Sequence, residues 1–507
     1  MIDLRPDFLD TLKRLLAEIV PDCEVRIFGS RYNWTATDAS DLDLALVGPG
    51  KLHWKTLARL KSALEESSLP YRVDVLDWRA ISPEFQQVIK QGYEVIQKPE
   101  LAMSSKGWNT WKIGDIGRIV TGKTPPTQNP NNFGDKHPFI TPRDMLGQKC
   151  IHQTERYLSE EGKNTVKNCL LPAKSVCVSC IGSDMGKVVM TTADSVTNQQ
   201  LNSVICKASF DPDFVYYALV NISDELRNVG HHSTAVPILN KTDFSNFEIT
   251  APDIVTQRRI ADVLSALDER IELNRQTIAT LEAIAQAIFK EWFVDFNFPG
   301  ATGEMQDREL GPIPKGWRVG TLAEFGEIVC GKTPPKAIPE FFGGHIPFVK
   351  IPDLHDSVFI TQTVDTLTDE GALSQRKKFI PPYSVVVSCI ATVGLVALTS
   401  KQCQTNQQIN AIVPSDKNAS LYLYFVMKSL RNTLKDLGSG GSATLNVNTK
   451  SFADIECRVP IGKLIKNFSE LVKPLFNRIL ETEHESSALV DIRDNLLPKL
   501  MSGEIAV

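Results

Sequence analysis

The sequence has no long hydrophobic run, and this excludes proteins that cross a membrane as helices. No stretch approaches the roughly 18 uninterrupted apolar residues that a transmembrane helix needs. The segment from Met1 to Pro6 also lacks the apolar core of a signal peptide. We therefore predict a cytoplasmic protein that makes no contact with a membrane.

Cysteine is scarce, with ten among 507 residues, and it lies mostly inside apolar runs at uneven spacings. This pattern is typical of buried thiols in a reducing compartment, so we expect no disulfide bonds. Cys177 and Cys180 have the spacing of half a zinc site, but no second Cys or His pair at ligand spacing accompanies them. We interpret this segment as a core strand.

An excess of positive charge is also lacking. The chain carries 55 Lys and Arg against 60 Asp and Glu, a net charge of -5. Contacts of Lys and Arg with phosphates dominate non-specific affinity for nucleic acid, so this balance argues against a free-standing protein that grips DNA by charge alone. The acidic excess lies mainly in the first hundred residues. DNA binding by the remainder stays open, and a basic partner could supply more phosphate contacts.

An internal repeat of about 208 residues organises the chain beyond residue 105. Three pairs of segments carry it: Gly107-Trp108 and Gly316-Trp317, Gly122-Lys123-Thr124-Pro125-Pro126 and Gly331-Lys332-Thr333-Pro334-Pro335, and Thr197-Asn198-Gln199-Gln200 and Thr405-Asn406-Gln407-Gln408. Each half opens with short apolar runs broken by Gly, Pro and Asn, which predicts a strand-rich globular unit.

Each half ends in a pattern of apolar residues at alternating steps of three and four, the heptad seam of a coiled coil. The first seam comprises Ile260, Leu264, Leu267, Ile271, Asn274, Ile278, Leu281, Ala285, Ile288 and Trp292, and the second comprises Val472, Leu475, Ile479, Thr482, Ser486, Leu489, Arg493, Leu496 and Leu500. We expect Ile492 to cover the second seam where Arg493 departs from it. A helix from about Thr256 to Trp292 would be on the order of 55 Å long, the size of a spacer. The alternative is that these helices close the core of a large enzyme.

The repeated segments, together with Gln257 to Leu264 at the start of the first seam, resemble the specificity subunit of Type I restriction-modification systems. The resemblance implies an α+β multidomain fold in which two strand-rich target-recognition domains alternate with two long antiparallel coiled-coil helices. Its implied partners are double-stranded DNA, two methyltransferase subunits on the helices, and restriction (endonuclease and translocase) subunits. The boundaries we predict are 105–252 for the first recognition domain, 253–298 for the first helix, 311–460 for the second domain and 461–504 for the second helix.

Two of the repeated motifs could bind nucleic acid or a nucleotide, but each could also serve only to fix a turn. Gly117 to Thr124 fits the spacing of a phosphate-binding loop, but Pro125-Pro126 disfavours the helix that such a loop must open, so we predict a turn between strands. The Asn and Gln side chains of Thr197 to Gln200 suit adenine readout. Two domains that read different half-sites should differ where they touch bases, however, so a motif identical in both copies more readily fixes a shared turn.

We expect DNA contacts in segments that differ between the copies, such as residues 143–148 against 353–357. The candidate DNA-binding residues are Arg143, Lys241, Lys350 and Lys450. The sequence contains no methyl-donor glycine loop, no Asn-Pro-Pro-Tyr motif and no cluster of nuclease carboxylates. Residues 105–507 are therefore expected to leave catalysis on DNA to partners.

The first hundred residues form a separate α/β domain with its own candidate site. An apolar strand leads into Gly29-Ser30-Arg31, and Asp41 and Asp43 then share one face of a strand whose leucines lie on the other face. Asp74 on a later strand offers a third carboxylate. Glycine would let nucleotide phosphates approach the backbone, and three aspartates could hold Mg²⁺.

These residues resemble the minimal nucleotidyltransferases of the polymerase-beta superfamily. The resemblance assigns catalysis and metal binding to Asp41, Asp43 and Asp74, and nucleotide binding to Gly29, Ser30 and Arg31. Trp34 stands where the family often has a small residue. Whether residues 1–100 are active stays open, and a retained fold could serve as a docking module. The alternative function for the whole chain is a nucleotidyltransferase that uses the repeats as a substrate-recognition scaffold.

Overall fold

The computed structural model describes residues 4–21, 23–37, 40–48, 52, 54–67, 69–98, 107–230, 238–355, 357–439 and 445–507. Contacts divide the chain into two compact units, Met1–Ala261 with Leu497–Val507, and Asp262–Leu496. Within the described residues, no helix combines the length and the apolar character that a membrane span needs.

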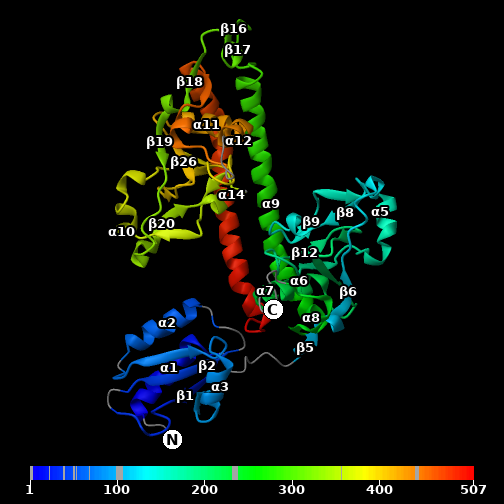
Figure 1. Cartoon of the computed structure of the whole chain (residues 1–507), viewed down its shortest axis with the longest axis vertical. Helices are drawn as coiled ribbons and strands as arrows, with labels where there is room; N and C mark the ends of the chain where they lie inside the picture. The colour runs from blue at the N-terminus through cyan, green and yellow to red at the C-terminus, as the bar shows by residue number, and fades with distance from the viewer. Residues whose placement is uncertain are drawn as a thin grey trace. The chain divides into compact units, whose positions relative to one another are not determined.

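The amino-terminal part of the first unit is a four-stranded sheet with helices, as predicted (Figure 1). Its elements are α1 (Pro6–Ile19), β1 (Glu24–Phe28), β2 (Leu42–Val47), α2 (Trp54–Glu65), β3 (Val73–Asp77), α3 (Pro83–Lys90) and β4 (Glu94–Gln97). The strand order is β3-β2-β1-β4, with β2 antiparallel to β1 and parallel to β3. The alternation of β2 buries Leu42, Leu44 and Leu46 in the core and leaves Asp43 half-buried at the opposite face.

The first recognition domain follows in the same unit. Its helices are α4 (Ile113–Ile116), η1 (Pro130–Asn132), η2 (Pro142–Asp144), α5 (Glu160–Thr165), η3 (Lys167–Cys169), α6 (Pro212–Asn221), α7 (Ser223–Gly230) and α8 (Lys241–Asn246). Its strands are β5 (Asn109–Lys112), β6 (Gly117–Thr121), β7 (Phe133–Gly134), β8 (His137–Ile140), β9 (Cys150–Ile151), β10 (Arg156–Leu158), β11 (Val176–Ser179), β12 (Val188–Thr191), β13 (Val196–Thr197), β14 (Leu201–Cys206) and β15 (Glu248–Ala251). They form sheets of order β6-β14-β11-β12-β9 and β13-β8-β10-β7, and β15 pairs with β5.

The second recognition domain, in the second unit, repeats this architecture. Its strands are β18 (Arg318–Thr321), β19 (Gly326–Cys330), β20 (Phe342–Val349), β21 (Phe359–Ile360), β22 (Asp365–Leu367), β23 (Val385–Ser388), β24 (Val396–Thr399), β25 (Gln404–Thr405), β26 (Ile409–Pro414) and β27 (Glu456–Val459). Its helices are η4 (Leu322–Glu324), η5 (Pro339–Phe341), η6 (Ile351–Leu354), α10 (Asp369–Leu373), η7 (Arg376–Lys378), α11 (Ala419–Ser429), α12 (Arg431–Gly438) and α13 (Thr449–Ala453). The large sheet has the order β19-β26-β23-β24-β21, which matches the first domain strand for strand. The hairpin β16 (Met305–Arg308) and β17 (Gly311–Pro314) precedes it.

The two long helices are α9 (Ile254–Phe293) and α14 (Gly462–Met501), each of 40 residues. At 1.5 Å per residue each is about 60 Å long, slightly more than expected. Within the second unit they lie side by side and run in opposite directions (Figure 1): Arg270 pairs with Glu485 at 2.7 Å, and Asp268 pairs with Arg493 at 2.7 Å. The predicted antiparallel coiled coil is confirmed.

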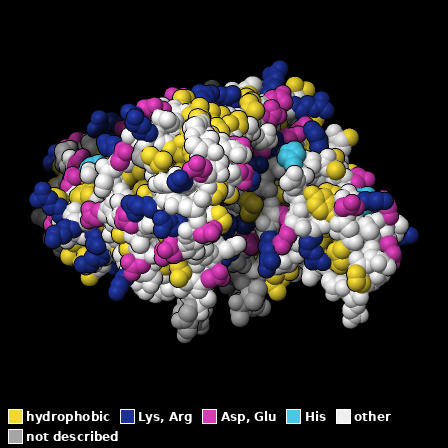
Figure 2. Space-filling view, turned by 90° about the horizontal axis from the view of Figure 1, so that it is seen from above, with side chains coloured by type: hydrophobic (Ala, Val, Ile, Leu, Met, Phe, Trp, Pro, Cys, Tyr) yellow, Lys and Arg dark blue, Asp and Glu magenta, His cyan; other side chains and the backbone are white. Residues whose placement is uncertain are grey.

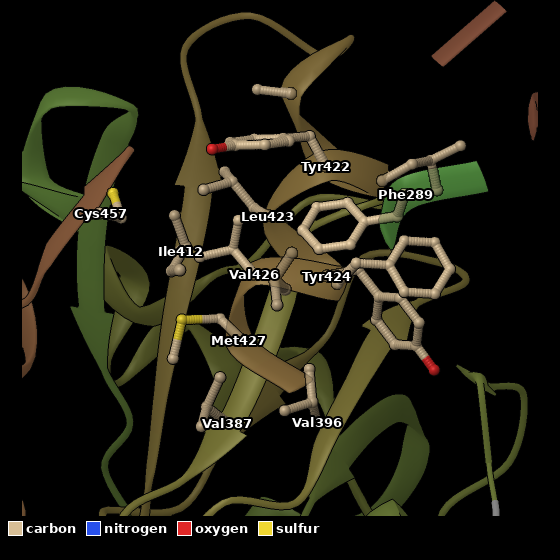
Figure 3. Close-up of a cluster of buried hydrophobic side chains, with 14 of the residues drawn as sticks. Phe289, Val387, Val396, Ile412, Tyr422, Leu423, Tyr424, Val426, Met427 and Cys457 are labelled. Atoms are coloured by element: carbon tan, nitrogen blue, oxygen red, sulfur yellow. The ribbon is translucent and has the colours of Figure 1, made fainter. Parts of the chain in front are cut away.

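The core of the second unit joins both helices to the second recognition domain. Phe289 and Phe293 of α9 and Phe468 and Phe476 of α14 belong to the same buried cluster as the sheet and α11. Figure 3 shows Phe289 beside Tyr422 and Tyr424 of α11, over side chains from the strands. Both helices therefore contribute to one domain core as well as to their own seam.

The structure corrects one detail of the second seam. Ile492 was expected to cover it, but this side chain is exposed. Arg493 itself is partly buried, and its guanidinium pairs with the partly buried carboxylate of Asp268 on α9. An ion pair fills the seam position where an apolar side chain was expected.

Candidate functional site

The two motifs shared by the recognition domains pack against each other. In the first domain the backbone N–H of Gly122 donates to Leu201 O at 3.0 Å, and that of Lys123 donates to Thr197 O at 2.9 Å. An added Cβ at Gly122 would lie 2.1 Å from Asn198 O, so only glycine fits. The hydroxyl of Thr124 donates to Gln199 Oε1 at 2.7 Å.

The second domain repeats this arrangement, with hydrogen-bond lengths that agree to within 0.1 Å. Gly331 N–H donates to Ile409 O at 3.1 Å, Lys332 N–H donates to Thr405 O at 2.9 Å, and Thr333 donates to Gln407 Oε1 at 2.7 Å. Asn198 and Asn406 each accept from a Gln backbone two residues on, at 3.1 Å in both copies. The prediction of a shared turn is confirmed. In both copies, the backbone N–H groups of the Gly-Lys pair, which a phosphate-binding loop would direct at its ligand, donate to carbonyl groups of the protein instead.

The predicted core strand at Cys177 is likewise confirmed. Cys177 lies in β11, and every residue of that strand is buried. Burial raises the pKa of the Cys177 thiol to about 12 and that of the Cys180 thiol to about 11. Both thiols are protonated at neutral pH, which disfavours the thiolate that zinc requires.

The helix seam contains a polar layer near its middle. Asn274 is 3% exposed and Thr482 is 1% exposed, and the two occupy equivalent positions in the repeat. Thr482 donates to the carbonyl of Arg478, whereas the amide nitrogen of Asn274 has no hydrogen-bond partner among the described residues. Asn274 was predicted to be a polar member of the seam, and the structure buries it there.

Glu483, beside this layer, anchors the second recognition domain to α14. Its carboxylate accepts from the backbone N–H of Val358 at 2.8 Å and from that of Phe359 at 3.0 Å. Burial, and secondarily the nearby Glu282 carboxylate, raise the pKa of Glu483 to about 7 against these hydrogen bonds. The sequence offered one signal for this role, because Glu483 replaces Arg275 of the other helix, but the repeat alone does not show which backbone it reaches.

The candidate nucleotide site lies where β1 ends. Gly29 has a φ of 75°, a left-handed conformation that favours glycine, and an added Cβ would lie 2.3 Å from Asp43 Oδ2. Asp43 is the register partner of Phe28 on β1 and of Asp74 on β3, and Asp41 directly precedes β2. The sheet therefore brings Gly29, Asp43 and Asp74 together as predicted.

The acidic residues influence one another electrostatically. Burial raises the pKa of Asp43, and the negative charges of Asp74 and Asp41 raise it further. Asp74 is partly exposed and lies 3.4 Å from the guanidinium of Arg72. Within the described residues, no three acidic, His or Cys side chains are grouped closely enough to hold a metal ion by themselves.

Carboxylates on adjacent strands nevertheless fit magnesium. This ion is commonly held by one or two protein carboxylates together with substrate phosphates, so a complete cluster of three protein ligands is not required. Asp43 and Asp74 are the pair best placed by register, and the repulsion that raises the pKa of Asp43 is what a divalent cation would relieve.

Both recognition domains match the profile of one known protein family. The profile of the Type I restriction modification DNA specificity domain matches residues 105–283 and 314–488, which is more than half of the chain. The chain belongs to the Type I DNA specificity family. The profile of the polymerase beta nucleotidyltransferase family matches residues 23–101.

Individual relatives support both assignments. The Type I restriction enzyme HindI specificity subunit of Haemophilus influenzae is 34% identical over 467 residues, covering 78% of this chain and 99% of the relative. The probable protein adenylyltransferase MntA of the same species is 42% identical over 99 residues, covering 20% of this chain and 87% of the relative. Among solved structures, a Type I S subunit from M. genitalium matches with a TM-score of 0.49 at 16% identity, covering 80% of this chain and 99% of that one. The chain is a Type I specificity subunit with an amino-terminal nucleotidyltransferase-like domain.

The predicted nucleotide ligands occupy different environments in this specificity subunit. Ser30 lies on the turn after Gly29, where its carbonyl accepts from Thr35 N–H at 3.0 Å. Arg31 is buried: its guanidinium donates to Ser40 O and lies 3.6 Å from the centre of the Tyr71 ring. Arg31 thus fixes the segment that leads to Asp41, and its direct contact with a nucleotide stays a prediction. Trp34 is 60% exposed and has a φ of 58°, a conformation that suits the small residue common in the family.

The predicted DNA-binding residues also differ in environment. Arg143 on η2, Lys241 on α8 and Lys450 on α13 are exposed. Lys350 is half-buried and its ammonium pairs with Asp365, so a phosphate there would have to compete with that carboxylate. All four stay predictions. The sequence also contains a histidine pair, His231-His232, which could lie at a loop tip near DNA; both residues lie outside the described part of the chain.

Proposed function

We propose that this specificity subunit recognises a bipartite DNA target, with one recognition domain on each half and the helices setting the gap between the halves. The observation that carries this proposal is the exact duplication of the large sheet and its packed motif pair. Two domains of one architecture with different exposed segments suit two different half-sites. Figure 2 shows Lys and Arg interspersed with Asp and Glu on the face in view. The whole chain carries a net charge of -5, so the proposal relies on base readout and partner contacts in addition to charge attraction.

The proposed protein partners are two methyltransferase subunits, with restriction subunits joining the assembly. Val263 and Leu471 are equivalent in the repeat and are 39% and 50% exposed. Ile284 and Ile492 are also equivalent and are 45% and 48% exposed. Exposed apolar side chains at matching positions give each helix the same contact surface, which suits two copies of one partner.

The assembly can be tested by co-expression with a modification subunit, followed by methylome sequencing and native mass spectrometry. We expect a methylated two-part sequence and two modification subunits per chain. Ile284→Asp or Ile492→Asp should each lose one modification subunit. Leu273→Asp is the matched control, because Leu273 is equally exposed but its counterpart is Glu481. Two partner copies retained by the double variant would exclude these surfaces as the docking sites.

We further propose that residues 1–100 transfer an adenylyl group to a hydroxyl of a protein. A hydroxyl oxygen would form a bond to the α-phosphorus of ATP, the bond from that phosphorus to the bridging oxygen would break, and pyrophosphate and a proton would leave. Gly29 leaves room for the Asp43 carboxylate beside the turn, and Asp43 and Asp74 would hold Mg²⁺. The ion would neutralise phosphate charge and stabilise the leaving pyrophosphate. The similarity to a probable protein adenylyltransferase supports this choice of nucleotide and acceptor.

Asp41→Asn and Asp43→Asn test this activity. The full chain with its partners would be incubated with Mg²⁺ and ATP labelled at the α-phosphate, and labelled protein would be measured. Each variant should abolish labelling and leave the methylated DNA sequence unchanged, because the two functions reside in separate domains. Asp10→Asn, an exposed acid on α1, is the control. Full labelling by Asp43→Asn would rule out the proposed site, and loss of specific methylation in a folded variant would show that the domains are not separable.

A further inference from the structure

The motif pair shared by the recognition domains contains exposed residues that packing does not explain. Gly122, Pro125 and Asn198 are buried, so their recurrence in the second domain follows from the shared turn. Lys123 and Gln199 are exposed, and their counterparts Lys332 and Gln407 are exposed too. Among the described residues, the turn uses only the backbone N–H of each lysine and the amide oxygen of each glutamine, so it does not explain why the lysine ammonium and the glutamine amide nitrogen are repeated.

The neighbouring exposed residues do vary. Directly after the proline pair the first domain has Thr127-Gln128 and the second has Lys336-Ala337. Exposed residues next to the turn therefore differ between the two domains, whereas the exposed lysine and glutamine are the same in both. Within the described residues, neither the Lys123 nor the Lys332 ammonium forms an ion pair, so each positive charge is available to an external anion.

The hydrogen bonds of the turn orient the glutamine as a donor. The Oε1 atom of Gln199 accepts from the Thr124 hydroxyl at 2.7 Å, and that of Gln407 accepts from Thr333 at the same distance. With the oxygen held inward, the Nε2 amide protons are presented to solvent. The backbone N–H of Lys123 is fixed on Thr197 O at 2.9 Å, and that of Lys332 on Thr405 O at the same distance, so the lysine starts from a defined position in each domain.

The two domains read different half-sites under the proposed function, on which this inference rests. An identical exposed feature cannot distinguish two different sequences, but it can contact what both half-sites share. The shared element is the phosphate backbone, for which an ammonium group and an amide donor are suitable ligands. We propose that Lys123 with Gln199, and Lys332 with Gln407, are equivalent phosphate contacts that fix the position of each recognition domain on its half-site.

Salt-dependent binding measures phosphate contacts directly. The full chain with its modification subunit would be titrated with a duplex that contains the methylated target and with an equally long duplex that lacks it, from 50 to 200 mM potassium salt. Lys123→Ala and Lys332→Ala should each lower the slope of log affinity against log salt by about one. Each should weaken binding to both duplexes roughly fivefold to tenfold at 100 mM salt, and the methylated sequence should stay the same.

Matched variants separate this role from a structural one. Lys123→Arg should keep the slope, because it keeps the charge. Gln199→Glu keeps the acceptor for Thr124 but presents a carboxylate to the phosphate, so it should weaken both duplexes without lowering the melting temperature of the protein. Lys401→Ala is the control, because Lys401 is an exposed turn lysine of the second domain with Ala193 at the equivalent position; its slope should not change.

Three results would overturn the inference while leaving the proposed function intact. They are an unchanged salt slope in the Lys123→Ala and Lys332→Ala double variant, an equal effect of Lys401→Ala, and a changed half-site sequence, which would make the lysine a base reader. Failure of the wild-type complex to prefer any target duplex would instead refute the proposed function itself.

Discussion

At the scale of single residues, the geometry of the candidate nucleotide site depends on Gly29. Its positive φ turns the chain at the end of β1, and its missing side chain leaves room for the Asp43 carboxylate. Both requirements point to glycine for different physical reasons, one conformational and one steric.

Gly29→Ala should therefore destabilise the amino-terminal domain by roughly 1–2 kcal/mol, because alanine is strained at this φ. It should also displace Asp43 and abolish labelling from ATP. Thermal unfolding and the labelling assay would measure the two effects. Gly147→Ala is a useful control, since Gly147 also has a positive φ but nothing lies within 4 Å of an added Cβ. Normal labelling by a folded Gly29→Ala protein would show that the close approach to Asp43 is unimportant.

Glu483 is the second residue whose environment predicts a measurable property. The residue is 9% exposed. The groups that face its carboxylate are the Val358 and Phe359 amides and the Glu282 carboxylate, which is itself bonded to Tyr424 and Lys428. Its folded-state pKa of about 7 lies above the ordinary value of 4.5. The folded protein thus binds the proton more tightly, so this stabilisation is full below pH 4.5 and is lost as the pH rises through 7.

Glu483→Gln should remove this pH dependence. From pH 4 to pH 8 the wild type should lose about 3 kcal/mol of unfolding free energy relative to the variant. This follows because each unit of pKa difference between the folded and unfolded states corresponds to about 1.4 kcal/mol. Denaturant unfolding of both proteins across this range would measure it. A constant difference across the range would mean that the Glu483 pKa is ordinary in the folded protein.

At the scale of elements, the coiled coil and the second recognition domain share residues. The carboxyl-terminal half of α9 and the amino-terminal half of α14 belong to the domain core, through Phe289 and Phe293 on one side and Phe468 and Phe476 on the other. The remaining halves meet through the Arg270–Glu485 and Asp268–Arg493 ion pairs. A change of length in one helix alone would misalign either the core or the ion pairs.

The spacer role consequently needs a paired insertion. Four residues added after Arg275 in α9 and four after Glu483 in α14 should lengthen both helices by about 6 Å, with the core residues and the Glu483 anchor left in place. DNA rises about 3.4 Å per base pair, so the unspecified gap between half-sites should widen by one or two base pairs. Methylome sequencing would measure it, after native mass spectrometry has shown that the modification subunits still bind. The single insertion in α9 serves as the comparison and should impair assembly. Methylation at the original gap by an assembled paired variant would refute the spacer role.

At the scale of the whole molecule, the chain combines two recognition domains with a nucleotidyltransferase-like domain. Each recognition domain has its own large sheet and its own copy of the motif pair. This independence predicts that one half-site can be changed without the other.

Exchange of residues 107–250 for the equivalent region of a relative with a different target should alter one half of the methylated sequence only. The other half and the gap should stay the same, because residues 316–459 and both helices are untouched. Methylome sequencing of cells with the hybrid complex gives the result. A change in both halves would contradict the assignment of one domain to each half-site.

The sequence by itself determined the repeat, the seams and the acidic positions of the candidate nucleotide site. These are local or periodic signals: a heptad recurs along one helix, and alternation places Asp43 on the face of β2 opposite its buried leucines. Asp41 was predicted to share that strand, but the strand begins one residue later, at Leu42. The Gly-Lys-Thr-Pro-Pro and Thr-Asn-Gln-Gln motifs were also visible as repeated segments, and proline was enough to exclude a phosphate loop.

Only the tertiary structure decided which distant residues meet. It placed Gly122 against Asn198, fixed Gln199 on Thr124, and carried Glu483 to the backbone of Val358. It also paired Arg493 with Asp268 where the heptad pattern favoured cover by Ile492, because the pattern gives the face of one helix but not the charge that the partner helix presents there. Contacts between residues far apart in the chain depend on how the elements pack, and no single segment encodes that packing.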